Sequence, residues 1–301
     1  MKAIVVHEYG GPEVLKYETY PDPVPGPGEV LVRVAAASVN PIDYKRRAGL
    51  TKDFYPLHFP GLIGVDMSGT VEEVGSGAES FGAGNRVFAM ADNTYAELCV
   101  VKAEALADIP EGLDLIEAAA LPLVTVTGNQ LLAATEIKAG QMVLVLGAVG
   151  NVGRSAVFTA KDRGATVIAG VLNKQMDEAK IVGADQVVAT DDESAIASLA
   201  PLDAVADTVG GRTATKLIAK VKAGGVFASV AGKPQNAAEY PSVKVVAVFS
   251  HFDRDTLQFM AEAVRDGKLV IPIGKELPLS EAAEAHAEAE KGGTGKILLL
   301  P

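Results

Sequence analysis

The sequence predicts an α/β protein that combines a doubly wound parallel sheet with a second, β-rich domain. A short apolar run, Met142 to Leu146, leads through three glycines into a helical segment, and strand-like and helical segments then alternate to residue 231. Before residue 112 the strand candidates are short and lie between Gly- and Pro-rich stretches. Alternating strands and helices are typical of a parallel sheet with helices on both faces. The 301 residues, 49% of them hydrophobic, are enough for two domains.

The N-terminal part of the chain, to about Gly112, predicts an irregular all-β module. The stretches PDPVPGPGEV and GSGAESFGAGNRV place turn-forming Gly and Pro between its strands. Two predicted helices, residues 115–120 and 123–134, are broken at Pro122 and lead to the apolar run. The strand candidates of the module are residues 2–6, 29–35, 69–74, 86–89 and 96–101.

The glycine turn GAVGNVG, residues 147–153, predicts a dinucleotide-binding site. It joins a buried strand to a helix over residues 151–163, and Gly164 stands at the helix C-cap. Free N–H groups at a helix N-terminus favour an anion such as a pyrophosphate. A purely structural turn is the alternative, but the strand–turn–helix context favours the coenzyme. The predicted contacts are Gly147, Ala148, Val149, Gly150, Asn151, Val152 and Gly153.

The end of the second predicted strand, residues 166–171, favours NADPH over NADH. Chains that bind NAD place an acid there, about 20 residues past the glycines, to hold the ribose hydroxyls. Here Asn173 and Lys174 follow the strand, and the first carboxylate is Asp177, inside the next predicted helix over residues 174–182. An amide and a cation suit a 2′-phosphate better than an acid does. A lysine that is only solvated at a helix start is the alternative for Lys174.

The remaining elements complete the sheet and return the chain to the β-rich domain. Residues 242–249 form an apolar run that would leave an exposed sheet edge, which favours a homodimer through edge pairing. Ser280 is the expected N-cap of a helix over residues 280–291. The other expected elements are strands at 186–190, 203–209, 225–231 and 296–300, and helices ending at 195 and over 212–221 and 253–265.

Charge and composition narrow the possible partners. A net charge of −11 argues against nucleic acid and anionic membranes as partners. No apolar run approaches the length of a signal or membrane-spanning segment, so a cytoplasmic protein is expected. The single cysteine excludes an intramolecular disulfide, and the four histidines are scattered without the spacing of metal ligands. No metal site is therefore expected.

Short strings with a family character are spread over almost the whole chain: GGPEVL, PGPGEVLVRVAAASVNPIDYKRRAG, PGLIGVDMSGTVEEVGSG, ALPLVTVTG, GAVGNVG, DTVGG, GGVFASVAG and GTGKILL. Together they resemble the medium-chain dehydrogenase/reductase superfamily, in its zinc-independent quinone oxidoreductase branch with zeta-crystallin and the enone reductases. The resemblance implies a Rossmann domain over residues 122–251. It also implies a GroES-like catalytic domain over residues 1–121 and 252–301.

The resemblance implies hydride transfer from NADPH to a quinone or an α,β-unsaturated carbonyl, without zinc. In the zinc-dependent members a Cys and a His-Glu pair hold the metal; here Asn40 stands at the Cys position and Val65-Asp66 at the His-Glu position. The loop around Asn40 resembles the active-site loop, in which Asn40 is expected to hold substrate or coenzyme. Tyr44 and Lys45 are candidate donors to the acceptor oxygen, with packing and solvation as their alternatives. Asp43 and Arg47 are expected to form a local ion pair.

Further coenzyme contacts follow from the resemblance alone. Thr127 is expected near the nicotinamide ribose or amide, and Gly295-Lys296 on the phosphate side. Thr190 stands where many members have a tyrosine near the adenine. The remaining expected contacts, which line the nicotinamide channel, are Thr208, Val209, Gly210, Val230, Ala231, Gly232, Phe249 and Ser250.

Two alternative functions stay open on the sequence. One is a catalytically weak NADP(H)-binding protein with a structural or regulatory role. The other is an enoyl reductase that acts on acyl thioesters. No pattern in the sequence selects the acceptor.

Overall fold

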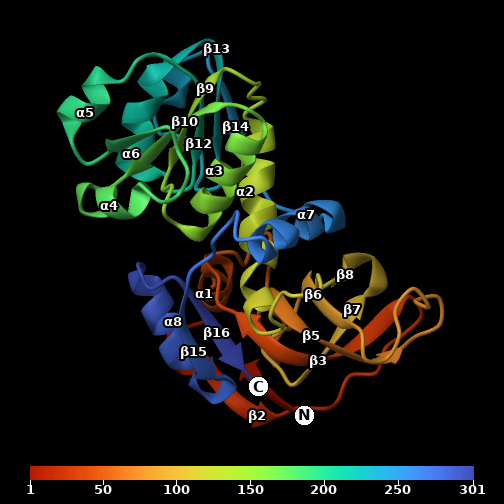
Figure 1. Cartoon of the computed structure of the whole chain (residues 1–301). Coiled ribbons are helices and arrows are strands. Elements are labelled where there is room, and N and C mark those ends of the chain that lie inside the picture. Colours follow the sequence, from red (N-terminus) through yellow and green to blue (C-terminus); the bar gives the residue numbers. More distant parts are fainter. The chain divides into compact units, whose positions relative to one another are not determined.

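The computed structural model describes residues 1–301, and the chain divides into two compact units (Figure 1). Unit 1 contains Met1–Leu123, Phe252–Gly267 and Ile271–Pro301. Unit 2 contains Val124–His251 and Lys268–Val270. No helix is long and apolar enough to cross a bilayer.

Unit 2 is built on a six-stranded, all-parallel sheet in the order β11-β10-β9-β12-β13-β14. The strands are β9 (Met142–Leu146), β10 (Thr166–Val171), β11 (Gln186–Ala189), β12 (Leu202–Asp207), β13 (Val221–Ser229) and β14 (Lys244–Ala247). The helices are α2 (Pro122–Ala134), α3 (Asn151–Asp162), α4 (Met176–Ala179), α5 (Glu193–Ser198) and α6 (Gly211–Leu217). Short 3-10 turns are η4 (Asn173–Gln175), η5 (Ile218–Lys220) and η6 (Ala237–Glu239).

Alternate residues of strand β9 feed two separate apolar cores, one on each face of this sheet. Val143 and Val145 pack with residues of α2 and α3, whereas Leu144 and Leu146 pack with residues of α5 and α6. A strand whose two faces are both buried reads as a continuous apolar run, as MVLVL does. The predicted doubly wound parallel sheet is confirmed.

Unit 1 is β-rich, with one seven-stranded and one three-stranded sheet. The larger sheet contains β3 (Glu29–Ser38), β5 (Asp66–Val74), β6 (Arg86–Met90), β7 (Leu98–Lys102), β8 (Ala107–Asp108), β15 (Ile273–Pro278) and β16 (Lys296–Leu300). The smaller sheet contains β1 (Lys2–Val6), β2 (Leu15–Thr19) and β4 (Gly61–Leu62). The helices are α1 (Pro41–Arg47), α7 (Arg254–Arg265) and α8 (Ala282–Lys291), with 3-10 turns η1 (Pro12–Val14), η2 (Ala103–Ala105), η3 (Glu117–Ala120) and η7 (Leu279–Glu281).

Two local predictions in unit 1 differ from the structure. The segment around Asn40 contains helix α1, with Asn40 as its N-cap and Pro41 in its first turn. The prediction that Ser280 caps the last helix is wrong, because α8 starts at Ala282 with Glu281 as N-cap. Ser280 instead lies within the preceding 3-10 turn η7, which takes up the first residues of the expected helix.

Candidate active site

The glycine turn between β9 and α3 exposes bare backbone at the carboxyl end of a parallel strand. Gly147 has a φ of +80°, and a Cβ on it would lie 2.3 Å from Thr208 Oγ1. A Cβ on Gly153 would lie 2.1 Å from the carbonyl oxygen of Gly147. Gly150 is the N-cap of α3 and has no side chain to cap the helix. The N-terminal N–H groups of α3 are therefore left for an anion, as a coenzyme pyrophosphate requires.

Two side chains hold this turn in place. Arg154 Nε donates to the carbonyl oxygen of Val149 at 2.8 Å, while its Nη2 pairs with Glu178 Oε1 at 2.7 Å. Thr208 Oγ1 donates to the carbonyl oxygen of Leu146 at 2.8 Å. The turn is thus fixed from α3 on one side and from the end of β12 on the other. A preorganised backbone loses little conformational freedom when a ligand binds.

The predicted channel residues follow strands β12, β13 and β14, whose carboxyl ends share one edge of the sheet. Asp207 Oδ1 accepts from the backbone N of Val209 at 2.9 Å and of Gly210 at 2.8 Å, which shapes the loop after β12. Val209 and Phe249 are exposed, at 56% and 80%. The structure places these groups at the same sheet edge as the glycine turn: Thr208, Val209 and Gly210 after β12, Val230, Ala231 and Gly232 after β13, and Phe249 and Ser250 after β14.

Thr127 on α2 carries a buried hydroxyl without a partner. The residue is buried, with 7% of its surface exposed, and its Oγ1 makes no hydrogen bond. The neighbouring Gly128 lets α2 pack closely on α3, because a Cβ there would lie 2.5 Å from Ser155 Cβ. Buried polar atoms almost always have a partner, so an orphaned hydroxyl indicates a missing ligand or water. Thr127 therefore fits the coenzyme contact that the resemblance implies.

A polar cluster lies buried in unit 1, at Asn40, Asp66 and Lys296. Lys296 Nζ donates to Asn40 Oδ1 at 2.7 Å and lies 3.6 Å from Asp66 Oδ2. Asn40 Nδ2 donates to Asp66 Oδ2 at 2.8 Å. The backbone N of Leu123 donates to Asp66 Oδ1 at 2.9 Å. Burial lowers the pKa of Lys296 and raises the pKa of Asp66, and each charge opposes the shift of the other.

A chain of hydrogen bonds connects the polar cluster to His286 on α8. Arg47 Nη1 donates to His286 Nδ1 at 3.3 Å, His286 Nε2 lies 3.3 Å from Tyr95 Oη, and Tyr95 Oη donates to Asp43 Oδ2 at 3.0 Å. The backbone N of Asn40 also donates to Asp43 Oδ2, at 2.8 Å. The predicted Asp43–Arg47 ion pair is wrong, because Arg47 Nη2 pairs with Glu290 Oε1 at 2.5 Å.

The expected active-site residues of unit 1 occupy different environments. Asn40 is fully buried, with both side-chain atoms bonded within the polar cluster. Tyr44 is half-buried, and burial raises the pKa of its hydroxyl, with further contributions from the carboxylates of Glu290 and Asp43. Lys45 is exposed. Lys296 is 2% exposed and engaged in the polar cluster, a position that does not suit the phosphate contact expected for Gly295-Lys296.

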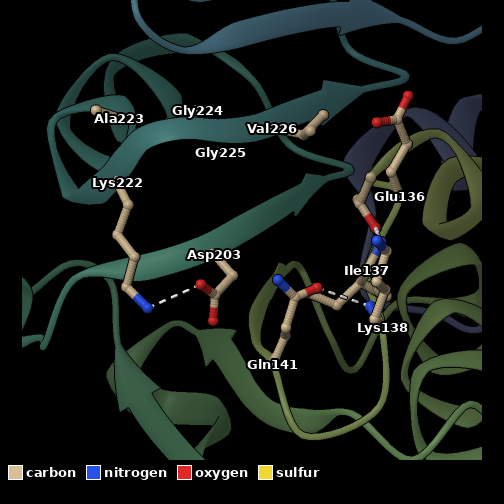
Figure 2. Close-up of a pocket in the computed structure, with 11 residues that line it drawn as sticks. Glu136, Ile137, Lys138, Gln141, Asp203, Lys222, Ala223, Gly224, Gly225 and Val226 are labelled. Carbon is tan, nitrogen blue, oxygen red and sulfur yellow. Dashed lines mark hydrogen bonds and ion pairs between the residues drawn. The ribbon is translucent and has the colours of Figure 1, made fainter.

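A separate hollow of about 310 Å³ lies at the opposite edge of the unit 2 sheet, where the strands start (Figure 2). Figure 2 shows Lys222 beside Asp203, whose Oδ1 accepts from Lys222 Nζ at 2.8 Å. Asp203 Oδ2 accepts from the backbone N of Met142 at 2.8 Å. These groups satisfy one another. Ligands of parallel sheets bind at the carboxyl ends of the strands, so this hollow is distinct from the candidate site.

Comparison with known proteins gives matches along the whole chain. The model of the alcohol dehydrogenase GroES-like domain matches residues 26–111, and that of a zinc-binding dehydrogenase matches residues 182–299. A quinone oxidoreductase of Pseudomonas aeruginosa is 33% identical, over 100% of this chain and 99% of the relative. A chloroplastic NADPH-dependent alkenal/one oxidoreductase of Arabidopsis thaliana is 30% identical, over 100% and 80%. The structure of Escherichia coli quinone oxidoreductase complexed with NADPH has a TM-score of 0.88 at 27% identity, with full coverage of both chains.

The residues of the polar cluster do not fit the zinc ion that the name of the second family model implies. No group of three or more His, Cys, Asp or Glu side chains gathers where it could hold a metal. Asn40 Oδ1 already accepts from Lys296, and Val65 has no donor atom. The Lys296 ammonium, 3.6 Å from Asp66 Oδ2, would repel a divalent cation. The cluster carries its own cation in place of a metal.

Proposed function

Because the chain belongs to the quinone oxidoreductase branch of the medium-chain dehydrogenase/reductase superfamily, we propose that it transfers hydride from NADPH to a quinone or an α,β-unsaturated carbonyl. Bound NADPH supplies the hydride from its nicotinamide ring. In an enone the hydride adds to the β-carbon and a proton then adds to the α-carbon of the resulting enolate, whereas in a quinone the proton ends on oxygen to give the hydroquinone. The glycine turn carries this proposal, since its bare backbone suits a pyrophosphate.

Unit 2 supplies the binding of the coenzyme. The N–H groups at the start of α3 hold the pyrophosphate, and the orphaned Thr127 Oγ1 takes a polar group of the nicotinamide end. Asn173 and Lys174 are both exposed after β10, where a 2′-phosphate meets an amide and a cation. NADPH is named for the alkenal/one oxidoreductase and for the Escherichia coli structure, which supports the same choice here.

Unit 1 supplies the groups that act on the acceptor. Tyr44 is our candidate donor to the acceptor oxygen, because it lies in the active-site segment after Asn40 and its phenol, whose pKa burial raises further, is protonated at neutral pH. Lys45 is exposed and is the second candidate. Asn40 is a positioning residue, because both ends of its amide are bonded within the polar cluster. No step passes through zinc.

The assembly and location of the enzyme are also proposals. Strand β14 forms an edge of the unit 2 sheet and carries the apolar pair Val245 and Val246, which supports a homodimer formed by edge pairing. Sedimentation equilibrium tests this, and a monomer at micromolar concentration would contradict it. We also propose that the enzyme is cytoplasmic, and the net charge of −11 supports the absence of nucleic-acid and anionic-membrane partners.

Steady-state oxidation of NADPH with a quinone panel and an enal/enone panel tests the proposed activity. We expect turnover on at least one panel. Tyr44→Phe should lower kcat by about tenfold to a hundredfold, because it removes one donor to the developing oxyanion. Tyr17→Phe, a change at an exposed tyrosine of β2, is the matched control and should leave kcat unchanged.

Three results would contradict parts of this proposal. Tight NADPH binding without turnover on either panel would favour the weakly catalytic binding protein. Turnover on acyl thioesters alone would favour the enoyl reductase. Equal activity of Tyr44→Phe and the wild type would remove Tyr44 from the reaction.

A further inference from the structure

The end of strand β10 carries a carboxylate that comes from the neighbouring strand. β10 and β11 pair in parallel with Val171 opposite Ala189, so Asn173 and Asp191 leave the sheet side by side. Asp191 Oδ1 accepts a 2.7 Å hydrogen bond from the backbone N of Asn173. Just before it, the backbone N of Thr190 donates to the carbonyl oxygen of Val171 at 2.7 Å. The two bonds fix the Asp191 carboxylate at the end of β10.

We propose that Asp191 sets the coenzyme preference by weakening the binding of the NADPH 2′-phosphate, so that the chain binds NADH as well. This inference rests on the proposed function, because it concerns the same coenzyme site. In proteins that bind NAD, the acid that holds the ribose hydroxyls stands at the end of the second strand. Asp191 brings a carboxylate to that place from the third strand. It belongs neither to β10 nor to the residues that continue β10.

The second oxygen of Asp191 is available for such a role. Asp191 is exposed, and its Oδ2 makes no hydrogen bond in the structure. A carboxylate oxygen accepts a hydrogen bond from a ribose hydroxyl, whereas it repels a phosphate. Lys174 lies next to Asn173 and acts in the opposite direction, by attracting the phosphate. The two charges together reduce the discrimination between the coenzymes.

The neighbouring acids of the β11–α5 connection are engaged elsewhere. Asp192 Oδ1 caps α5 by accepting from the backbone N of Ser194 at 2.8 Å. Glu193 Oε1 pairs with Lys216 Nζ at 2.6 Å. Among these three consecutive acids, only Asp191 bonds to Asn173, two residues after the end of β10. Glu193 therefore provides a matched control with the same change of charge.

Calorimetric titration with NADH and with NADPH tests the inference without requiring turnover. Wild-type dissociation constants for the two coenzymes should lie within about tenfold of each other. Asp191→Asn keeps an acceptor for the Asn173 N–H but removes the charge, so NADPH should bind about tenfold more tightly. NADH binding should stay unchanged or weaken. Glu193→Gln should leave the ratio of the two constants unchanged, and Lys174→Gln should weaken NADPH alone.

The outcomes separate this inference from the proposed function. If the wild type binds coenzyme but Asp191→Asn leaves the NADPH-to-NADH ratio unchanged, the role of Asp191 is overturned and the proposed function stands. If the wild type binds neither coenzyme, both are overturned. Asp191→Ser, which keeps a short hydroxyl acceptor, should repeat the gain in NADPH affinity. Its failure to do so would also overturn the role of the charge.

Discussion

The glycine turn of unit 2 and the polar cluster of unit 1 present polar groups in opposite ways. In the turn, glycines remove side chains so that backbone N–H groups stay free for a ligand. In the cluster, buried side chains form hydrogen bonds with one another and are shielded from solvent: Asn40 bonds to both Asp66 and Lys296. The start of α3 is ready to bind because no side chain caps its N–H groups, although the N–H groups of Gly147 and Gly150 are bonded within the turn. The polar cluster, whose groups already have partners, instead makes unit 1 rigid, and it contributes to function only by positioning other residues.

Removal of the cation from the polar cluster should have the largest effect. Lys296→Met leaves the Asp66 carboxylate buried without its counter-charge. We expect a loss of about 3–5 kcal/mol in the free energy of unfolding, because one partner of a buried pair is left uncompensated. Urea unfolding at pH 7 measures this loss.

Two further variants test whether the stability lost in Lys296→Met comes from the burial of Lys296 and from its pairing with Asp66. Lys275→Met removes a lysine from the partly exposed pair with Glu288 in the same unit and should cost much less than Lys296→Met, because solvent screens the pair. The double variant Lys296→Met/Asp66→Asn should cost less than the sum of its single changes. Additive costs would show that Lys296 and Asp66 do not act as a pair.

The glycine turn could be predicted from the sequence because it is contiguous. One strand, three glycines and one helix occupy residues 142–162, and the structure places them as expected. The parallel sheet followed from the alternation of segments. Helix α1 also has a local signal in the sequence: Asn40 is the N-cap, Pro41 lies in the first turn, and the Asp43 carboxylate accepts from the backbone N of Asn40.

The polar cluster could not be predicted in the same way, because tertiary structure assembles it. Lys296 and Asn40 are 256 residues apart, and no local pattern connects them. The ion pair expected from the i, i+4 spacing of Asp43 and Arg47 was wrong for the same reason. His286 and Glu290 reach Arg47 from α8, while Tyr95 reaches Asp43. Asp191 is an intermediate case, since it needs only the β10–β11 register.

Adding a single methyl group at each of two turn glycines should separate the packing of the turn from its binding role. Gly153→Ala brings a Cβ to 2.1 Å from the carbonyl oxygen of Gly147, so the backbone must shift. We expect a loss of about 1–3 kcal/mol in stability and about 100-fold weaker NADPH binding. Thermal unfolding and calorimetry measure the two effects.

Gly150→Ala should affect binding without the loss of stability. Its Cβ would lie 3.3 Å from the Gly147 oxygen, and its φ of −69° suits alanine. Because Gly150 is the N-cap of α3, we expect the methyl group to hinder the approach of a pyrophosphate to the N–H groups that follow. NADPH binding should weaken by about tenfold while the free energy of unfolding changes by less than about 0.5 kcal/mol. Unchanged binding would show that the pyrophosphate does not approach this backbone.

The pH dependence of stability should report the buried hydrogen-bond chain that runs from Asp43 through Tyr95 to His286. Burial raises the pKa of Asp43 from 3.8 to about 7, so between these values the folded chain keeps a proton that the unfolded chain gives up. The preference of the folded chain for the protonated Asp43 carboxyl contributes to stability in full below pH 3.8, and this contribution is lost as the pH rises to about 7. Burial lowers the pKa of His286 from 6.5 to about 3. Its contribution has the opposite sign: it is present above pH 6.5 and is lost as the pH falls to about 3.

Asp43→Asn should isolate the first of these contributions. The amide oxygen can still accept from the backbone N of Asn40 and from Tyr95, whereas the titrating proton is gone. The variant should gain on the order of 3 kcal/mol relative to the wild type between pH 4 and pH 7, because only the wild type must bury a charge as the pH rises. Urea unfolding across this range measures the difference. A difference that does not change with pH would mean that Asp43 is ionised in the folded chain at pH 4, with enough support from its neighbours to offset its burial.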